Sequence, residues 1–300
     1  MTPIQQQDRP ATAAVPPEVA LHPRNVHFDW SSVPLHWIPG EAFASHTINV
    51  LHLLLPEGET WFIRVFEEAL PHIRDEALRE AVLGFIGQEA LHAEAHSHVL
   101  DHLGEQGIDC EPYQRQMRWL FHKMLGDRPE LDGPRQMRYL QERVALVSAI
   151  EHFTAFLGQW ALDAVALEKA GADPTMLDLL RWHGAEEVEH RAVAFDLAQH
   201  LAGGYPLRVK SALMSISTLI ILWWRGVRFF LEADPVTRDD RRARLRRYVS
   251  DSHRELLPRI WTMLRSYARY IRPSYHPLQD FNTAQAVAYL ATSPAARGAH

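Results

Sequence analysis

The sequence predicts an all-α protein, built as a four-helix bundle with additional C-terminal helices. Four long segments place apolar residues three or four positions apart, which is the period of a helix with one buried face. Breaks rich in Gly, Pro and Asp separate these segments. Each segment also carries an acidic side chain inside its apolar stripe, at a matching distance from a break. These observations indicate a bundle whose interior is partly polar.

The clearest of these stripes runs from Pro174 to about Leu201. On a helix of 3.6 residues per turn, Glu187 and His190 lie on the same face, within positions that are otherwise apolar. An ionised carboxylate in an apolar seam is strongly unfavourable unless it is paired or bound to a metal ion. The Glu-x-x-His spacing directs an oxygen and an imidazole nitrogen to the same point. This spacing therefore predicts a pair of metal ligands.

The same spacing occurs once more upstream, and two further stripes carry a single acid. Glu89 and His92 repeat the Glu-x-x-His pair on the second segment, whereas Glu59 and Glu151 are the single acids of the first and third segments. Bundles that hold two iron or manganese ions use one Glu from each of two helices and Glu-x-x-His from the other two. The sequence thus predicts six metal ligands, to which the last segment contributes the second Glu-x-x-His.

The spacing of these acids supports the assignment. In an antiparallel helix pair, residues at equal depth lie equally far from the connecting turn. The acids of the first and second segments have their midpoint at residue 74, and those of the third and fourth at residue 169. Turn signals lie close to both midpoints, at residues 71–75 and 169–174. Glu67 and Glu68 fail this test, because they flank the stripe and lie too near the turn.

Breaks in the pattern divide the chain into four parts. Residues 1–40 are predicted as a flexible N-terminal arm, 41–204 as the dimetal bundle, 205–290 as a helical extension packed on the bundle, and 291–300 as a loose tail. Helices are expected at about 41–73, 75–103, 133–170, 174–201 and 252–271, with a short one at 112–125 in a long connection. Pro56-Glu-Gly58 interrupts the first pattern, so Glu59 would lie at a kink or a new helix N-terminus.

Composition limits the partners and the compartment. The formal net charge of −6 offers no basic footprint for nucleic acid. The single cysteine, Cys110, fits a reducing compartment, and the N-terminal residues do not read as a secretory signal. We therefore expect a cytoplasmic protein, with membrane association as an alternative. A homodimer along bundle faces is a further expectation.

The uncharged run 211–224 has two interpretations. Its fourteen residues are too few to span a bilayer, which needs about 20, so a helix buried against the bundle is favoured. Alternatively, residues 211–228 form a peripheral membrane contact or the wall of a channel for an apolar substrate, with Trp223 and Trp224 at the boundary. The basic run 238–247 is interpreted as a solvated helix face.

Three further side chains are candidates for roles at the site. His183 precedes Glu187 by one turn and is a candidate third imidazole ligand. His96 follows His92 by one turn. It is a candidate metal ligand or a hydrogen-bond donor that orients a ligand. Thr154, one turn after the acid of the third segment, could line an oxygen pocket. For all three, a hydrogen-bonded core residue is the alternative.

Five segments carry a family resemblance: LPEGETWF (55–62), QEALHAEAH (88–96), EHF (151–153), HGAEEVEH (183–190) and RPSYHP (272–277). Through them, about 24–285 resembles the ferritin-like family of predicted metal-dependent hydrolases, which implies Glu59 rather than Glu67 as the first ligand. The site alone, through His183, Glu187 and His190, also resembles the di-iron arylamine N-oxygenases. That likeness implies an additional histidine ligand at His183.

These observations favour a dimetal enzyme that activates O2 to oxidise or oxygenate a small, apolar molecule. Iron is the favoured metal, with manganese or a mixed Mn/Fe pair as alternatives, and an electron donor is an expected partner. Hydrolysis by water bound to the metal pair is the second interpretation, in line with the family resemblance. The third is a metal-storage or metal-stabilised bundle without catalysis, which the long C-terminal extension disfavours.

Overall fold

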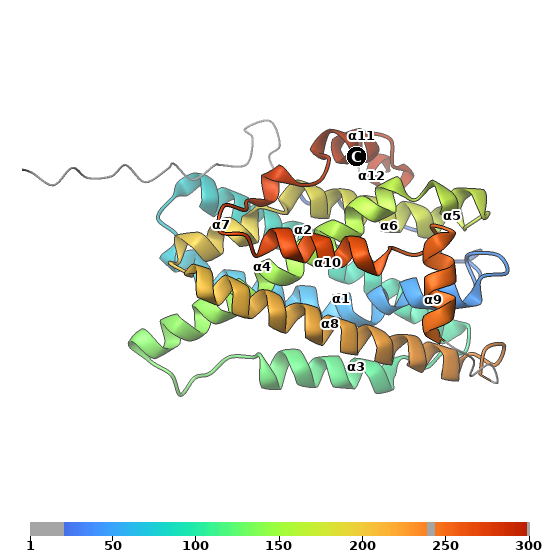
Figure 1. The fold of residues 1–300 in the computed structure, drawn as a ribbon, viewed down its shortest axis with the longest axis horizontal. Coiled ribbons are helices and arrows are strands. Elements are labelled where there is room, and N and C mark those ends of the chain that lie inside the picture. Colours follow the sequence, from blue (N-terminus) through green and yellow to red (C-terminus); the bar gives the residue numbers. More distant parts are fainter. Residues whose placement is uncertain (1–20, 239–243, 299–300) are drawn as a thin grey trace, which may run out of the picture.

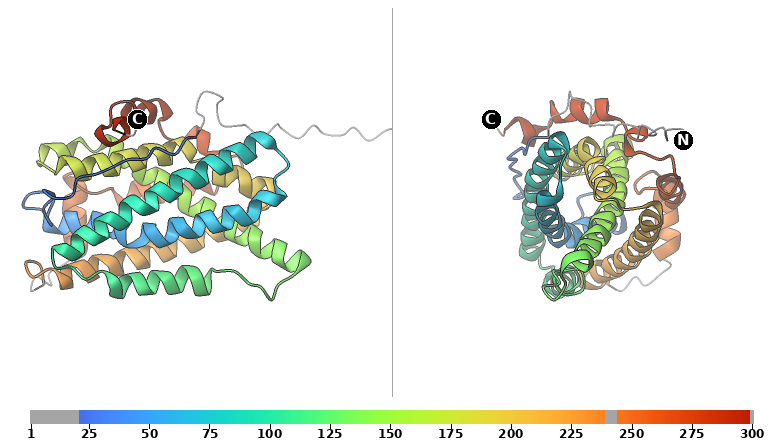
Figure 2. Two further views of the ribbon diagram at one scale, coloured as in Figure 1. Left: turned by 180° about the vertical axis from the view of Figure 1, so that it is seen from behind. Right: turned by 90° about the vertical axis from the view of Figure 1, so that its left-hand side faces the viewer.

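The computed structural model describes residues 21–238 and 244–298, and in these ranges it contains helices and no strands. The long bundle helices are α1 (Ala42–Ala69), α2 (Glu76–Glu105), α4 (Gly133–Asp163) and a fourth formed by α6 (Pro174–His190) and α7 (Val193–His200). Helix α1 packs against α2, and α4 packs against α6 and α7; α1 also contacts α4, while α2 contacts α6 and α7. The bundle is thus closed on itself (Figures 1 and 2), which confirms the predicted all-α class.

Both predicted turns lie where the spacing placed them. The turn between α1 and α2 contains the 3-10 helix Leu70–His72, and Asp75 caps α2 by accepting a hydrogen bond from the backbone N–H of Leu78. The second turn contains α5 (Val165–Lys169) and ends at Asp173, whose carboxylate accepts from two N–H groups in the first turn of α6. The third helix therefore ends at Asp163, earlier than predicted.

Helix α1 differs from the expectation at Pro56. The helix runs without a break from Ala42 to Ala69, so the predicted new N-terminus before Glu59 is wrong. Proline removes one backbone donor, yet twenty buried residues of α1 hold the helix in place, and the Thr60 hydroxyl donates to the Pro56 carbonyl at 2.7 Å. The fourth helix, in contrast, has a break that was not predicted, at residues 191–192, directly after His190.

The connection between α2 and α4 contains α3 (Glu111–Arg118), continued by a π-helical turn at Trp119–Met124. This agrees with the short helix predicted at 112–125. Helix α3 lies along α1 on the outside of the bundle (Figure 1), where the Gln114 side chain donates to the Leu53 carbonyl at 3.0 Å.

The predicted N-terminal arm falls into two parts. Residues 1–20 lie outside the described residues. Residues 21–40 run along the bundle, and Leu21, Phe28 and Trp37 are buried there. The Trp37 indole donates to Asn49 at 2.8 Å, and the backbone N–H of Asp173 donates to the Trp37 carbonyl at 2.7 Å. This part of the chain is therefore a strap packed on the bundle.

The C-terminal extension begins with α8 (Tyr205–Ala233), which crosses α1 and α4 on the outside of the bundle (Figures 1 and 2). One face is buried, but Leu213, Ile220 and Ile221 are about half exposed, so the buried-helix interpretation of 211–224 holds for one face only. By length and composition α8 would suffice to cross a membrane, and 22% of its apolar window is buried.

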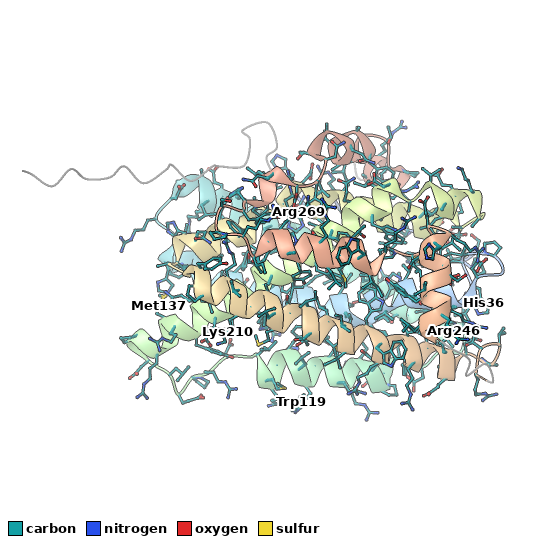
Figure 3. All side chains as sticks on the ribbon, in the orientation of Figure 1. His36, Trp119, Met137, Lys210, Arg246 and Arg269 are labelled. Atoms are coloured by element: carbon teal, nitrogen blue, oxygen red, sulfur yellow. The ribbon has the colours of Figure 1, made fainter. Side chains whose placement is uncertain are left out.

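The remaining helices are α9 (Arg244–His253), α10 (Ile260–Tyr270), a 3-10 turn at Pro277–Gln279, α11 (Thr283–Leu290) and α12 (Pro294–Arg297). The helix predicted at 252–271 is thus two helices, with Pro258 between them. The basic run 238–247 lies largely outside the described residues, although Arg246 is exposed on α9 (Figure 3). The tail is not loose up to residue 298, because the Ser293 hydroxyl and the Ala295 N–H donate to buried Asp178.

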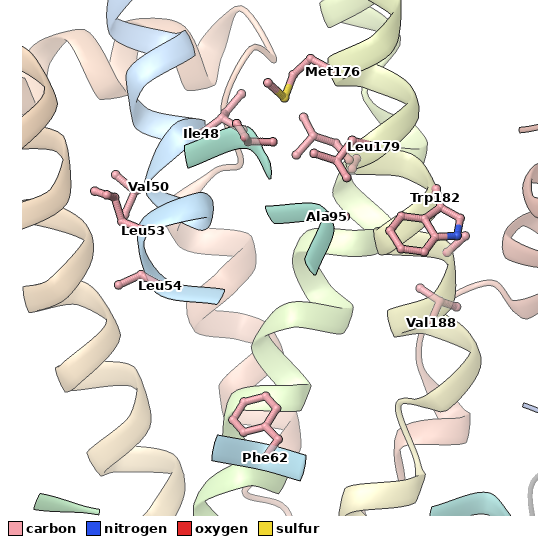
Figure 4. Packing of buried hydrophobic residues seen from close by; sticks show 14 of the residues in the cluster. Ile48, Val50, Leu53, Leu54, Phe62, Ala95, Met176, Leu179, Trp182 and Val188 are labelled. Atoms are coloured by element: carbon pink, nitrogen blue, oxygen red, sulfur yellow. The ribbon is translucent and has the colours of Figure 1, made fainter. Parts of the chain in front are cut away.

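The apolar core fills the bundle on both sides of the polar level at which the predicted ligands lie. Leu53, Phe62 and Trp182 are among its buried members, and Figure 4 shows them on α1 and α6. Their packing against apolar neighbours excludes water from the interior, so the polar side chains enclosed there must find partners among themselves or bind a ligand.

Candidate metal centre

The predicted ligands converge in the middle of the bundle. The structure brings together two groups whose ligand atoms lie within 4.8 Å of one another, and every member of both groups is buried. The first group comprises Glu59, His92, His183 and Glu187, and the second comprises Glu89, His92, Glu187 and His190. His92 and Glu187 belong to both groups, so the two groups adjoin each other, and His92 could bind one ion through Nδ1.

Glu151 completes the set on the side of the second group. Its Oε2 lies 3.6 Å from Nδ1 of His190, and the Glu151 side chain is fully buried. His190 Nε2 in turn lies 3.5 Å from Oε1 of Glu89. Seven side chains from four bundle helices thus surround one volume, as the order of acids and histidines in the sequence predicts.

Many of the atoms that face this volume have no hydrogen-bond partner in the described part of the chain. They are both carboxylate oxygens of Glu59, Glu89 and Glu151, Nδ1 of His92, and both ring nitrogens of His190. A buried polar atom without a partner costs about 1–3 kcal/mol. Such a concentration of unpaired oxygen and nitrogen acceptors is explained at once by cations bound between them, and the donor set fits two divalent ions.

The electrostatics of the acids lead to the same conclusion. Burial raises the pKa of Glu59 and Glu151 well above the usual value and that of Glu89 to about 7, and neighbouring carboxylates raise each of them further. Burial acts in the same direction on Glu187, but His190 and His183 outweigh it and lower the Glu187 pKa to about 2. Without cations the cluster thus retains protons, whereas two divalent ions would balance four ionised carboxylates.

His92 is oriented by a network that reaches the N-terminal strap. Its Nε2 donates to Glu186 at 2.8 Å, which leaves Nδ1 directed at Glu89, 3.6 Å away. Arg24 donates to Glu186 at 2.6 Å and to Glu189 at 2.9 Å, and both acids are buried. The pairing with His92 and Arg24 holds the imidazole in the orientation that a metal ligand needs. The sequence pattern pointed to neither Arg24 nor its role.

A chain of three histidines leads away from the first group. His183 Nε2 lies 2.8 Å from Glu187 and 3.6 Å from Glu59, whereas its Nδ1 lies 2.6 Å from His96 Nε2. The other nitrogen of His96 lies 2.7 Å from Nδ1 of His52. Both nitrogens of His96 are therefore engaged by histidines, which places this residue behind His183 rather than among the ligands.

The hydrogen bonds between these three histidines constrain which ring nitrogens carry protons. If His183 binds a cation through Nε2, its Nδ1–H donates to His96, and the Nδ1–H of His96 then donates to His52. Burial lowers the pKa of His52 to about 3 and that of His96 well below the usual value, so the neutral forms that this scheme needs are favoured. His52 was not predicted, although it precedes Glu59 by two helical turns and so shares its face.

Thr154 acts on Glu187. Its hydroxyl donates to Oε2 of Glu187 at 2.5 Å and lies 3.1 Å from the Glu151 carbonyl. The hydroxyl proton is thus engaged by the carboxylate, which places Thr154 as a positioning residue rather than as a wall of an oxygen pocket. Aromatic side chains close the opposite side: Phe85 lies 4.7 Å from the ring of His190 and stacks on Phe66 at 4.5 Å.

A comparison with known protein families now bears on this site. The model of a family described as predicted metal-dependent hydrolases matches residues 22–280, which includes all seven of these side chains. The chain belongs to the family of predicted metal-dependent hydrolases. No curated protein and no solved structure matches the chain. Membership of the family and the buried His and Glu groups together indicate a metal-dependent protein.

Glu67 and Glu68, which the spacing excluded as metal ligands, both lie away from the candidate centre. Glu68 is paired with Arg143 on the outer side of the bundle, and Arg143 also binds Asp127 at 3.0 Å. Glu67 is exposed. Their exclusion in favour of Glu59 thus agrees with the structure.

The two helices that carry Glu151 and Glu187 approach each other at a pair of glycines. Gly158 lies two turns after Glu151 on α4, and Gly184 lies one turn before Glu187 on α6. A Cβ atom added to Gly158 would lie 2.4 Å from the Gly184 carbonyl oxygen, which is too close for any side chain. The backbones therefore touch directly beside the candidate centre.

Proposed function

We propose that this protein is a dimetal carboxylate enzyme that uses two bound ions, iron in the first place and manganese or a mixed Mn/Fe pair as alternatives, to activate O2 and oxidise a small, apolar molecule. The observation that supports this proposal is the buried set of four carboxylates and three imidazoles whose inward atoms have no partners among the described residues. Carboxylates stabilise the higher oxidation state of iron, and their change of binding mode accommodates both oxidation states. The bound metal pair would supply the redox chemistry.

The residues of the chain itself would hold, orient and shield the ions. Glu59 and His183 would hold ions together with Glu187 in one group, and Glu89 and His190 in the other, while His92 would bind one ion through Nδ1. Glu151 lies beside His190. Thr154 fixes one oxygen of Glu187, Glu186 fixes His92, and Phe85 with its stacked partner excludes water from the side of His190. An oxygenation would also need electrons from a donor, which we include as a partner.

Hydrolysis is the second candidate, and the family description favours it. A metal pair lowers the pKa of bound water, so the same residues could hold ions that support the cleavage of an ester or phosphoester bond. The two candidates use the same ligands, so they differ in the metal ion and the reaction rather than in the ligand set.

The decisive experiment measures O2 uptake and hydrolysis on one preparation. The full chain is loaded with Fe(II) under anaerobic conditions, the bound metal is determined, and O2 consumption is followed after mixing with air-saturated buffer. We expect O2 uptake in proportion to bound iron and a visible absorption band that anaerobic samples lack. Glu187→Ala should abolish both, and Glu68→Ala, outside the site, should preserve both.

Other outcomes would replace the proposal. Hydrolysis of aryl esters or phosphoesters under strict anaerobiosis, with no O2 uptake by the iron-loaded protein, would establish the hydrolase instead. Binding of many iron ions per chain after repeated oxidation, without turnover of any organic molecule, would indicate storage. Loading with Mn(II) and Zn(II) in parallel separates a redox requirement from a structural one, because Zn(II) does not change its oxidation state.

A further inference from the structure

A second enclosed space lies on the outer side of the bundle, between α1 and α4 on one side and α8, α9 and α10 on the other. Its volume is about 300 Å³. Leu51 and Phe153 form the wall toward the bundle, and Ile216, Trp223 and Met263 belong to the wall formed by the extension. None of the candidate metal ligands is among the residues that line it. This cavity is thus separate from the candidate centre.

The walls are almost entirely apolar, and three of their polar groups are already paired within the protein. The Trp223 indole donates to the Thr47 carbonyl at 3.0 Å, the Tyr248 hydroxyl donates to the Pro258 carbonyl at 2.8 Å, and the Tyr267 hydroxyl donates to the Ala149 carbonyl at 3.2 Å. A polar ligand inside would lose its hydrogen bonds to water and find few replacements. The interior therefore selects for hydrocarbon.

The cavity also reaches the surface. Ile220, Trp224, Leu245 and Ile260 line it and are between 39% and 58% exposed, so they form an apolar rim. Exposed apolar side chains continue outward from this rim at Ile221 and Trp261. An interior without polar partners that opens to water through an apolar rim suits a molecule with one apolar end and one polar end. The polar end would remain outside.

The volume of the cavity and the charge beside its rim indicate which class of ligand it could bind. An apolar cavity of about 150 Å³ binds benzene, so this cavity has about twice the room and could hold a hydrocarbon chain of medium length. Exposed arginines lie beside the rim: Arg246 follows Leu245 on α9 (Figure 3), and Arg259, which also lies 3.6 Å from the exposed Glu255 carboxylate, precedes Ile260. From these observations we propose that the cavity between the bundle and α8–α10 binds the alkyl chain of a single-chain anionic amphiphile, such as a fatty acid. This site goes beyond the proposed reaction and does not depend on bound metal.

The first test titrates the full protein with dodecanoate, below its micelle-forming concentration, by isothermal calorimetry. Leu219→Trp places a larger side chain into the cavity and should weaken binding by about tenfold or more. Ile221→Trp makes the same kind of change two residues away, at a position that is 58% exposed and does not line the cavity, and binding should remain within about twofold. Equal affinity of the two variants would overturn the proposal.

A second test uses the unaltered protein, in case Leu219→Trp does not fold. Trp160, Trp223 and Trp224 line the cavity, and bromine quenches tryptophan fluorescence on contact. We expect 12-bromododecanoate, brominated at the end of the chain, to quench more strongly than 2-bromododecanoate, brominated next to the carboxylate. Equal quenching would contradict insertion of the chain.

The same fluorescence signal separates a free amphiphile from a membrane surface. Protein that sediments with phosphatidylglycerol vesicles but shows no saturable response to monomeric 12-bromododecanoate would identify the rim as a membrane-docking surface and overturn the proposed cavity site. Saturable quenching without vesicles would support it. Because neither measurement involves metal or turnover, a failure here is distinguishable from a failure of the proposed dimetal function.

Discussion

Glu151 and His152 are neighbours on α4, yet they belong to two buried clusters of opposite character. Glu151 faces the candidate centre, where both of its oxygens lack a partner among the described residues. His152 faces the extension, where its ring nitrogens lie 2.9 Å from the Ser266 hydroxyl and 3.2 Å from that of Tyr275. Tyr270 stacks near the same ring and hydrogen bonds to Ser148 at 2.9 Å.

The difference teaches how to distinguish a ligand site from a polar core. Both clusters are buried and both contain imidazole, so burial and residue type do not separate them. The pairing of polar atoms does: the His152 cluster satisfies itself, whereas the cluster around Glu151 leaves acceptors unpaired and acids at a raised pKa. The first cluster is therefore complete without a ligand, whereas the second has the unpaired atoms with which it could hold cations.

The largest expected effect follows from removal of a ligand shared by both ion positions. Glu187→Ala should reduce bound metal from about two ions per chain toward one or zero. It should also lower the unfolding temperature of the metal-loaded protein by on the order of 10 °C, because cation binding no longer stabilises the folded state to the same extent. Metal analysis and calorimetry check both results. Retention of two ions would remove the distinction between the clusters.

A pH titration of the metal-free protein tests the raised pKa of a single acid. Burial raises the pKa of Glu89 to about 7 from the usual 4.5 of a glutamate, so its ionisation opposes folding as the pH rises through this range. Glu89→Gln, which stays neutral, should match the wild-type stability near pH 4 and exceed it by up to about 3 kcal/mol at pH 8. Denaturant unfolding after chelation measures this difference. A constant difference across the pH range would contradict the unpaired state of Glu89.

A complementary substitution tests the His152 cluster, in which the polar atoms are paired with one another. His152→Phe leaves the Ser266 and Tyr275 hydroxyls without their partner, which should lower the free energy of unfolding by about 1–3 kcal/mol. Bound metal should remain at the wild-type level, because His152 points away from the centre. Urea unfolding and metal analysis give the two values. Loss of metal in this variant would show that the clusters are coupled.

The smallest effect on the metal centre is expected at Glu68, on the outer side of the bundle. Glu68→Ala removes one partner of the buried Arg143 guanidinium, which retains Asp127 at 3.0 Å, so stability should fall by about 1–3 kcal/mol. The metal content should be unchanged. A loss of metal from this variant would instead place the first ligand at Glu68 rather than at Glu59.

The ligands were predictable because both their spacing and their surroundings are periodic. A carboxylate within an apolar helical stripe conflicts with burial, and the equal distances of Glu59 and Glu89 from their turn show that the conflict occurs at one depth. Helix ends with a local cause, such as Asp75 before α2, were also visible. The break after His190 has no comparable local signal in the sequence.

The residues that support the ligands were harder to predict. Arg24 lies in a segment without periodicity, and it meets Glu186 and Glu189 across more than 160 positions of sequence. A stripe also assigns one face to each helix, so it leaves Glu186 on a flank, although that flank is buried against α2 and the strap. Packing of the C-terminal residues on Asp178 is likewise a long-range contact without a sequence pattern.

The glycine contact between α4 and α6 has a consequence for the width of the centre. Side chains between helices can be exchanged and repacked, but two backbones in direct contact leave nothing to adjust. The contact between Gly158 and Gly184 therefore fixes how closely α4 approaches α6 beside Glu151 and Glu187. A single methyl group at either glycine would force the helices apart and change the distance across the centre without touching a ligand.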